Sequence, residues 1–165
     1  MKWQEFKNSA PRLGALAQEA FDDQHVAILG TLRSDGRPRI SPCEVYFTDG
    51  ELLLGMMPNS KKVDDLRRDP RITVVNGQEH REPKFGDVKI YGSAREITDA
   101  GVRQRFGDRQ YALIEWRPPD DVPLFAVDVE TCSFISFGSG RRFIRWTIDR
   151  GEEELAHPEE DEPGG

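Results

Sequence analysis

The strongest constraint on the fold is a series of short strand-like segments joined by tight-turn dipeptides. Residues 26–32 and 51–57 are apolar runs rich in strand-forming residues, and residues 38–48 form a third such segment between them. The turns are Asp35-Gly36 and Asp49-Gly50, whose residues tolerate the positive φ angles of tight hairpins. Hairpins place successive strands side by side and antiparallel. We therefore expect a small barrel or strongly curled sheet rather than a doubly wound fold.

The rest of the chain continues this mainly β pattern with flanking helices. Further strands are expected at residues 71–76, 87–97, 124–137 and 141–149. One helix is expected after Ser9 as N-cap, with Pro11 in its first turn. A second covers residues 59–68, and a third runs from Thr98 or Asp99 to about Phe106. The total is about seven strands and three helices.

Length and charge point to one domain followed by a tail. A chain of 165 residues suits a single core, which we place in residues 1–150. Residues 151–165 read as an acidic, disordered tail, since residues 152–165 hold seven carboxylates and no Lys or Arg. Without them the body carries 23 acidic and 23 basic residues. No basic surface for nucleic acid is expected, and without a membrane-length apolar run or signal sequence we expect a cytoplasmic protein.

The second expected strand has an unusual edge. Pro38 and Pro42 cannot donate a backbone hydrogen bond to a neighbouring strand. Part of this strand should therefore lie at an edge or a bulge. Because side chains alternate along a strand, Arg39 and Ser41 share one face. An edge beside this polar row is a natural rim for a ligand.

The third expected strand leads into Asn59-Ser60-Lys61-Lys62, at the start of a short helix. The first turn of a helix has backbone N–H groups without intrahelical partners and a partial positive charge, which favour a phosphate. Lysine in this turn is electrostatically unfavourable unless an anion is bound. Asp64 and Asp65 offer another explanation, because they are close enough to offset the lysine charges.

Other site chemistries receive little support from the sequence. Cys43 and Cys132 form no CxxC pair, so neither a disulfide nor a zinc site is indicated. The histidines are His25, His80 in a charged loop and His157 in the tail, with no spacing typical of a metal site. We expect no protein-built metal site, although haem with a single histidine ligand remains open.

Two stretches, TLRSDGRPRISP and DGELLLGMMPNSKKVDDLRRDPR, resemble the flavin-binding split-barrel superfamily typified by pyridoxamine 5′-phosphate oxidase. The resemblance extends over residues 10–150 in the order of elements and over 26–75 in motifs. It implies an antiparallel split β-barrel, and the strand segments expected above give this barrel six to seven strands. It also implies a homodimer with FMN in a groove at the subunit interface.

The resemblance also carries site residues over to this chain. Ser60, Lys61 and Lys62 match the basic element that holds the FMN phosphate. Residues of the second strand match those along the isoalloxazine and ribityl chain, and Met56 is expected near the same groove. The strand residues concerned are Arg39, Ile40, Ser41 and Pro42.

The expected function is that of an FMN-dependent oxidoreductase acting on a small organic substrate. No catalytic side chain is assigned, since the flavin carries the hydride chemistry. One alternative keeps the fold and uses the deazaflavin coenzyme F-420; another is a non-catalytic flavin or haem binding or sensing protein. The oxidase has a further basic residue where this chain has Ser41, and its C-terminal substrate-reading motif is missing. Pyridoxamine phosphate is therefore a poor candidate substrate.

Overall fold

The computed structural model describes residues 1–77 and 86–158. The helices are α1 (Trp3–Ser9), α2 (Pro11–Gln24), α3 (Lys61–Arg68) and α4 (Ala100–Ile114). The strands are β1 (Val26–Leu32), β2 (Pro38–Thr48), β3 (Glu51–Gly55), β4 (Arg71–Asn76), β5 (Asp87–Glu96), β6 (Leu124–Ile135), β7 (Phe143–Thr147) and β8 (Gly151–Leu155).

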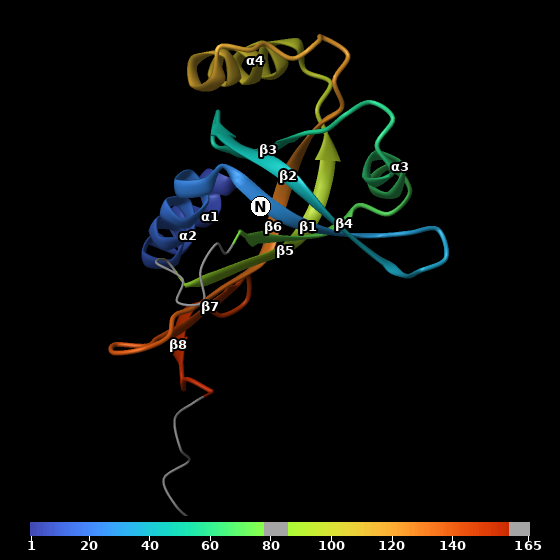
Figure 1. Ribbon diagram of the computed structural model, residues 1–165. Helices are drawn as coiled ribbons and strands as arrows, with labels where there is room; N and C mark the ends of the chain where they lie inside the picture. Colours follow the sequence, from blue (N-terminus) through green and yellow to red (C-terminus); the bar gives the residue numbers. More distant parts are fainter. Residues whose placement is uncertain (78–85, 159–165) are drawn as a thin grey trace, which may run out of the picture.

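The first six strands close into an antiparallel barrel. The strands follow one another in the order β3-β2-β1-β4-β5-β6, and β3 pairs with β6 to complete the ring. Strands β7 and β8 extend the sheet beyond β6, and they descend below the barrel in Figure 1. The expected six- to seven-stranded split barrel with flanking helices is confirmed.

The hairpins form where the turn residues predict them. Asp49 and Gly50 adopt φ angles of 55° and 72°, so both central residues of the β2–β3 turn are left-handed. This matches a type I′ turn, whose twist suits the flanking strands. Gly36 reaches φ 79° in the β1–β2 hairpin. Local turn chemistry thus brings β1, β2 and β3 together.

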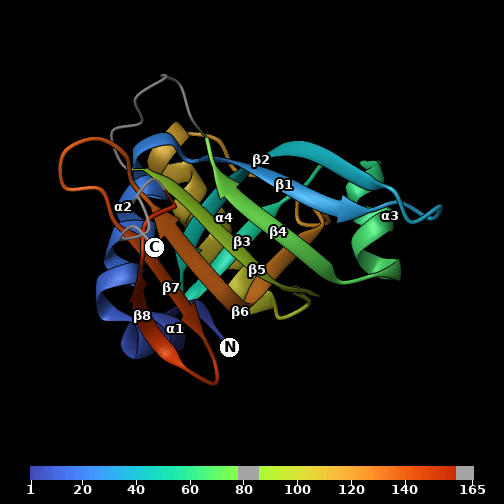
Figure 2. The same ribbon diagram turned by 90° about the horizontal axis from the view of Figure 1, so that it is seen from below.

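Helices α1 and α2 lie side by side against one end of the barrel (Figures 1 and 2). Trp3 and Phe6 are both buried, with ring centroids 5.2 Å apart, and the rings of Phe6 and Trp146 of β7 pack in a T-shaped arrangement. Leu13 and Ala17 of α2 are also buried, as their helical spacing predicts. The N-terminal helices therefore help to build the core.

Three helix boundaries differ from expectation. Helix α3, which was expected from residue 59, begins at Lys61. Ser9 is the last residue of α1, and Ala10 is the N-cap of α2. Asp99 caps α4 by accepting the Val102 N–H at 2.8 Å, but the helix continues to Ile114. The residues after Phe106 have weak apolar periodicity, because much of that segment is exposed.

The expectation that disorder begins at residue 151 is wrong. Gly151–Leu155 pairs with β7, and Arg12 of α2 contacts Glu152 at 3.1 Å. Glu152 and Glu154 therefore have a basic partner on a distant element, which composition alone does not reveal. His157, which was assigned to the same tail, is buried with Nε2 3.0 Å from the Ser136 carbonyl oxygen. His80 and residues 159–165 lie outside the described residues.

Strand β2 has an open edge, as its prolines predict. Residues 38–44 pair with β1, whereas only residues 45–48 pair with β3. The side of residues 38–44 that faces away from β1 has no strand partner among the described residues. Within the described part of the chain, no helix is long and apolar enough to cross a membrane.

Candidate functional site

Helix α3 begins beside the open edge of β2. Ser60 is its N-cap, with an extended backbone and no hydrogen bond from its side chain to the helix. The Ser60 carbonyl accepts the Val63 N–H at 3.0 Å, which closes the first turn. The hydroxyl and the first-turn N–H groups are donors of the kind that bind phosphate at helix N-termini.

The two lysines of this turn have different environments. Lys62 is only 9% exposed, and its Nζ donates to the Pro42 carbonyl oxygen at 2.7 Å. The Lys61 ammonium is largely exposed and lies 3.5 Å from the Asp64 carboxylate. Lys62 thus joins α3 to the open edge of β2, while Lys61 remains at the surface.

Arg39 is held by a buried carboxylate. Its Nε donates to Asp65 at 2.6 Å, and the Thr31 hydroxyl donates to the same oxygen at 3.0 Å. Arg68 reaches the other carboxylate oxygen at 3.3 Å. Burial alone would raise the pKa of Asp65, but the hydrogen bonds from Arg39, Thr31 and Arg68 outweigh it and lower the pKa. The Arg39 guanidinium is therefore oriented through Nε, and within residues 1–77 and 86–158 its terminal nitrogens have no hydrogen-bond partner.

The remaining strand residues divide between the two faces of β2. Ile40 and Pro42 are exposed on the outer face, whereas Arg39 and Ser41 are half-buried on the other. Met56 is buried in the core, and the neighbouring Met57 is 74% exposed. The structure thus brings Arg39, Pro42, Ser60 and Lys62 to one strand edge and directs the Met56 side chain away from it.

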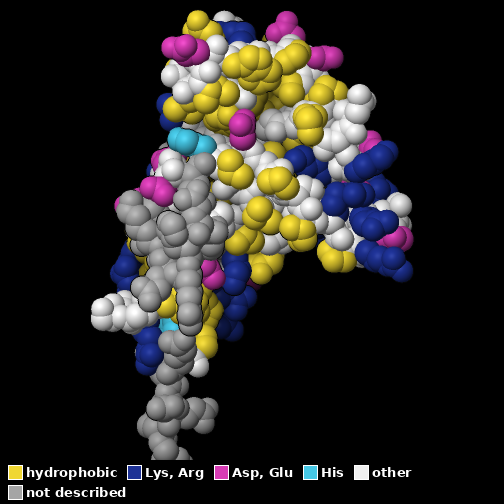
Figure 3. Space-filling model, in the orientation of Figure 1, with side chains coloured by type: hydrophobic (Ala, Val, Ile, Leu, Met, Phe, Trp, Pro, Cys, Tyr) yellow, Lys and Arg dark blue, Asp and Glu magenta, His cyan; other side chains and the backbone are white. Residues whose placement is uncertain are grey.

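An apolar groove of about 490 Å³ lies on the outer face of the barrel. Its lining residues come from β1, β2, β4, β5 and β6, and those at outward-facing positions include Ile28, Ile40, Thr73, Val75, Tyr91 and Glu130. In Figure 3, Lys and Arg side chains gather on the side of the molecule where α3 and the β1–β2 hairpin lie. Sequence reasoning found Ile40 but missed the other walls, because strands far apart in the chain form them.

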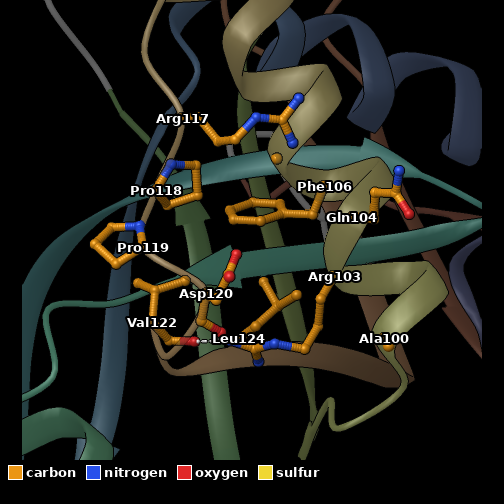
Figure 4. Close-up of a pocket in the computed structure, with 11 residues that line it drawn as sticks. Ala100, Arg103, Gln104, Phe106, Arg117, Pro118, Pro119, Asp120, Val122 and Leu124 are labelled. Atoms are coloured by element: carbon orange, nitrogen blue, oxygen red, sulfur yellow. Dashed lines mark hydrogen bonds between the residues drawn. The ribbon is translucent and has the colours of Figure 1, made fainter.

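A second cavity, of about 430 Å³, lies between α4 and the segment that leads to β6. Phe106, Pro118 and Pro119 form apolar walls in Figure 4. Arg103 donates to the carbonyl oxygens of Ile97 and Val122, at 3.0 and 2.6 Å, so it fixes the loop. These bonds indicate a structural role for Arg103.

Metal-binding chemistry is not evident in the described residues. Within residues 1–77 and 86–158, no group of three or more His, Cys, Asp or Glu is placed to hold a metal ion. Burial raises the pKa of the Cys43 thiol to about 11, with Lys62 acting in the opposite direction. Cys43 is therefore an inert, protonated thiol at neutral pH.

Comparison with known proteins gives a family and a fold. A family model described as pyridoxamine 5′-phosphate oxidase matches residues 13–136. A haem-binding protein from Mycobacterium smegmatis has a similar structure, with a TM-score of 0.63 and 20% identity. The match covers 80% of this chain but 57% of that protein, so this chain spans little more than half its length.

Two other solved structures match over most of their own length. A putative pyridoxamine 5′-phosphate oxidase from Listeria innocua has a TM-score of 0.61 and 15% identity, covering 73% of this chain and 96% of that one. A NimC/NimA family protein from Clostridium acetobutylicum has a TM-score of 0.64 and 17% identity, covering 78% and 89%. At these identities the similarity shows the shared fold.

Proposed function

We propose, because the chain belongs to the pyridoxamine 5′-phosphate oxidase family, that it is an FMN-dependent oxidoreductase acting on a small organic substrate. The observation that carries the proposal is that α3 is joined to β2 at its open edge by two bonds, from Arg39 to Asp65 and from Lys62 to the Pro42 carbonyl, with Ser60 as the N-cap of the helix. These side chains come from two elements and supply donors of the type that a phosphate requires.

The donor set fits a phosphate monoester. Lys62 has three N–H donors, and one is used by Pro42. A second anchor is Arg39, whose Nε is bonded to Asp65 and whose planar terminal nitrogens suit a phosphate. The Ser60 hydroxyl and the first-turn N–H groups complete the set. Lys61, at the surface, contributes mainly long-range attraction.

The outer face of β2 would support the rest of the cofactor. When bound, FMN would supply a ring that accepts or donates hydride. Ile40 and Pro42 offer an apolar surface beside the phosphate donors, and the nearby groove would shield the ring from water. The role of the protein is therefore to bind and orient the cofactor and to keep water away.

FMN titration tests the proposal directly. The purified full chain should bind FMN stoichiometrically, as measured by quenching of flavin fluorescence. Lys62→Met keeps the length of the side chain and should weaken FMN binding about tenfold or more, since a charge-assisted hydrogen bond is lost. Lys7→Met is the matched control, because α1 and α3 lie on opposite sides of the molecule (Figures 1 and 2). Absence of FMN binding would refute the proposal.

Oxidoreductase activity needs its own measurement. Under anaerobic conditions, NADH or NADPH should bleach the absorbance of the FMN-loaded protein, and an organic acceptor should restore it. Stoichiometric flavin binding without reduction by either donor would favour a binding or sensing role instead.

We also propose that the protein acts as a homodimer joined through the grooved outer face. Ile40 is 68% exposed there, beside the exposed Tyr91 and Ile28, and such a patch favours a protein interface. Ile40→Asp should shift the sedimentation coefficient from dimer to monomer and weaken FMN binding. Ile148→Asp is the control, because Ile148 is 67% exposed between β7 and β8. A monomeric wild-type protein would contradict this part of the proposal.

Two other ligands are alternatives to FMN for a protein of this fold. The deazaflavin coenzyme F-420 would use the same donors, and competitive titration against FMN distinguishes the two. Haem is the other candidate, because one similar structure is that of a haem-binding protein. A Soret band after haem titration, together with failure of FMN to bind, would favour it.

A further inference from the structure

The cavity between α4 and the segment that leads to β6 has walls that the protein's own hydrogen bonds hold in place. Arg103 of α4 donates to three carbonyl oxygens, those of Ile97 at 3.0 Å, Asp120 at 2.5 Å and Val122 at 2.6 Å. One guanidinium group thus ties α4 to the segments on both sides of it in the chain. A site that is preorganised in this way loses little conformational entropy when a ligand binds.

Two glycines leave room for side chains that shape this cavity. A Cβ on Gly55 of β3 would lie 2.8 Å from Phe106 Cζ, and one on Gly107 of α4 would lie 2.9 Å from Arg117 Nη1. Without those Cβ atoms, the Phe106 ring packs over β3, and the Arg117 side chain passes over Gly107 to pair with Asp108. Phe106 and Arg117 both line the cavity, so its shape depends on small residues in two separate elements.

The walls are mainly apolar and suit a flat ring. In Figure 4, Phe106 lies on one side of the cavity, and Pro118 and Pro119 lie on the other. Val122 and Leu124 add further apolar surface. A volume of about 430 Å³ is typical of small-molecule pockets, which are lined mainly by hydrophobic and aromatic side chains. The cavity therefore has room for a molecule of roughly one or two fused rings.

The cavity also contains a carboxylate with open hydrogen-bonding capacity. Asp120 lines it, and Figure 4 shows the carboxylate directed toward the Phe106 ring. Within residues 1–77 and 86–158, this carboxylate has no hydrogen bond or ion pair, because the bond to Arg103 is made by the backbone carbonyl. An ionised carboxylate only accepts hydrogen bonds, so its ligand must supply a donor. The guanidinium groups of Arg103 and Arg117 line the same cavity and oppose a positively charged ligand.

We propose that this cavity is a second ligand site, and that it binds an uncharged, planar heteroaromatic molecule whose ring N–H donates to the Asp120 carboxylate. The ring lies between Phe106 and the two prolines. The inference goes beyond the proposed function, because the residues that line this cavity include none of the phosphate donors and none of the outer groove. Ligand binding here does not depend on whether FMN binds.

Calorimetric titration of the full chain with three probes tests the chemistry of the site. Indole and benzofuran have the same shape and differ in a ring N–H or a ring oxygen, while benzamidine is planar and positively charged. Indole should bind about tenfold more tightly than benzofuran, because it gains a hydrogen bond to a charged group. Benzamidine should bind more weakly than indole. Equal affinity for indole and benzofuran, or tighter binding of benzamidine, would overturn the inference.

Matched variants and a localisation measurement assign the binding to this cavity. Asp120→Ala removes the acceptor and should weaken indole binding about tenfold. The variant should keep its fold, because the backbone carbonyl of residue 120 still accepts from Arg103. Asp121→Ala is the control, because Asp121 is exposed and is not among the residues that line the cavity.

In a two-dimensional amide NMR spectrum, indole should shift signals mainly within residues 100–107 and 117–124. Shifts confined to the outer groove around Ile28 and Ile40 would place the ligand elsewhere and overturn the inference. An unchanged indole affinity of Asp120→Ala would do the same.

Discussion

Replacing Asp65 by Asn should destabilise the protein far more than an average surface substitution. The Asp65 side chain is 4% exposed and accepts hydrogen bonds from Arg39, Thr31 and Arg68. Asparagine can still accept from Thr31, but it presents an uncharged amide to two guanidinium groups. The substitution therefore leaves Arg39 without its anionic partner.

The size of the loss in stability follows from the hydrogen-bond partners of Asp65. A hydrogen bond to a charged group contributes about 1.5–3 kcal/mol, and a buried partner left unpaired costs more. Arg68 is substantially exposed, so its contribution is small. We expect Asp65→Asn to lower the free energy of unfolding by about 2–4 kcal/mol. For a chain of this size that corresponds to a fall in Tm of roughly 5–15 °C.

The pH dependence gives a second measurement. Since the folded-state pKa of Asp65 is lowered, its contribution is fully present above the unfolded pKa of about 3.9. It is lost as the pH falls through the lower folded-state pKa. The difference in stability between wild type and Asp65→Asn should therefore be constant near neutral pH and shrink below about pH 4.

Urea unfolding of both proteins, monitored by tryptophan fluorescence, measures the change. Asp64→Asn is the control, because Asp64 lies on the same helix, is largely exposed and forms a 3.5 Å ion pair with the exposed Lys61. It should change stability by less than about 0.5 kcal/mol. The reasoning would be refuted if Asp65→Asn and Asp64→Asn had equal stability.

Three further predictions concern other parts of the fold. Gly92→Ala should lower the free energy of unfolding, measured in urea, by more than about 2 kcal/mol, because a Cβ would overlap the Asp128 carbonyl oxygen. Gly30→Ala should lower it much less, because the nearest atom to a Cβ there is 3.4 Å away. Asp99→Ala should lower stability by about 1 kcal/mol through loss of the α4 cap, and an unchanged Tm would contradict that role. Native protein at pH 8 should not react with a thiol reagent, because both cysteines are buried and their pKa values are raised. In urea, two thiols per chain should react. Fast reaction of the native protein would show that Cys43 is accessible.

Local chemistry explains why much of the barrel was predictable. Alternation along β2 placed Arg39 and Ser41 on one face, and the structure has both half-buried there. Turn residues placed β1, β2 and β3 in consecutive hairpins. The helix that strand, proline and cap signals predicted over residues 59–68 is present, although it begins at Lys61. These features depend on neighbours within a few residues.

The sequence alone determined the hairpin order, the alternation of side chains along β2, the partly unpaired edge of that strand and the presence of a basic helix start. Only the tertiary structure decided that Lys62 turns to Pro42 while Lys61 stays at the surface, and that Asp65 binds Arg39. It also paired Glu44 with Gln110, which lies 66 residues away, and made β8 from a segment expected to be disordered. The physical reason is that turn and strand propensities depend on residues close together in the chain. The partner of a charged side chain depends instead on which distant acceptor the closed barrel brings within hydrogen-bonding distance.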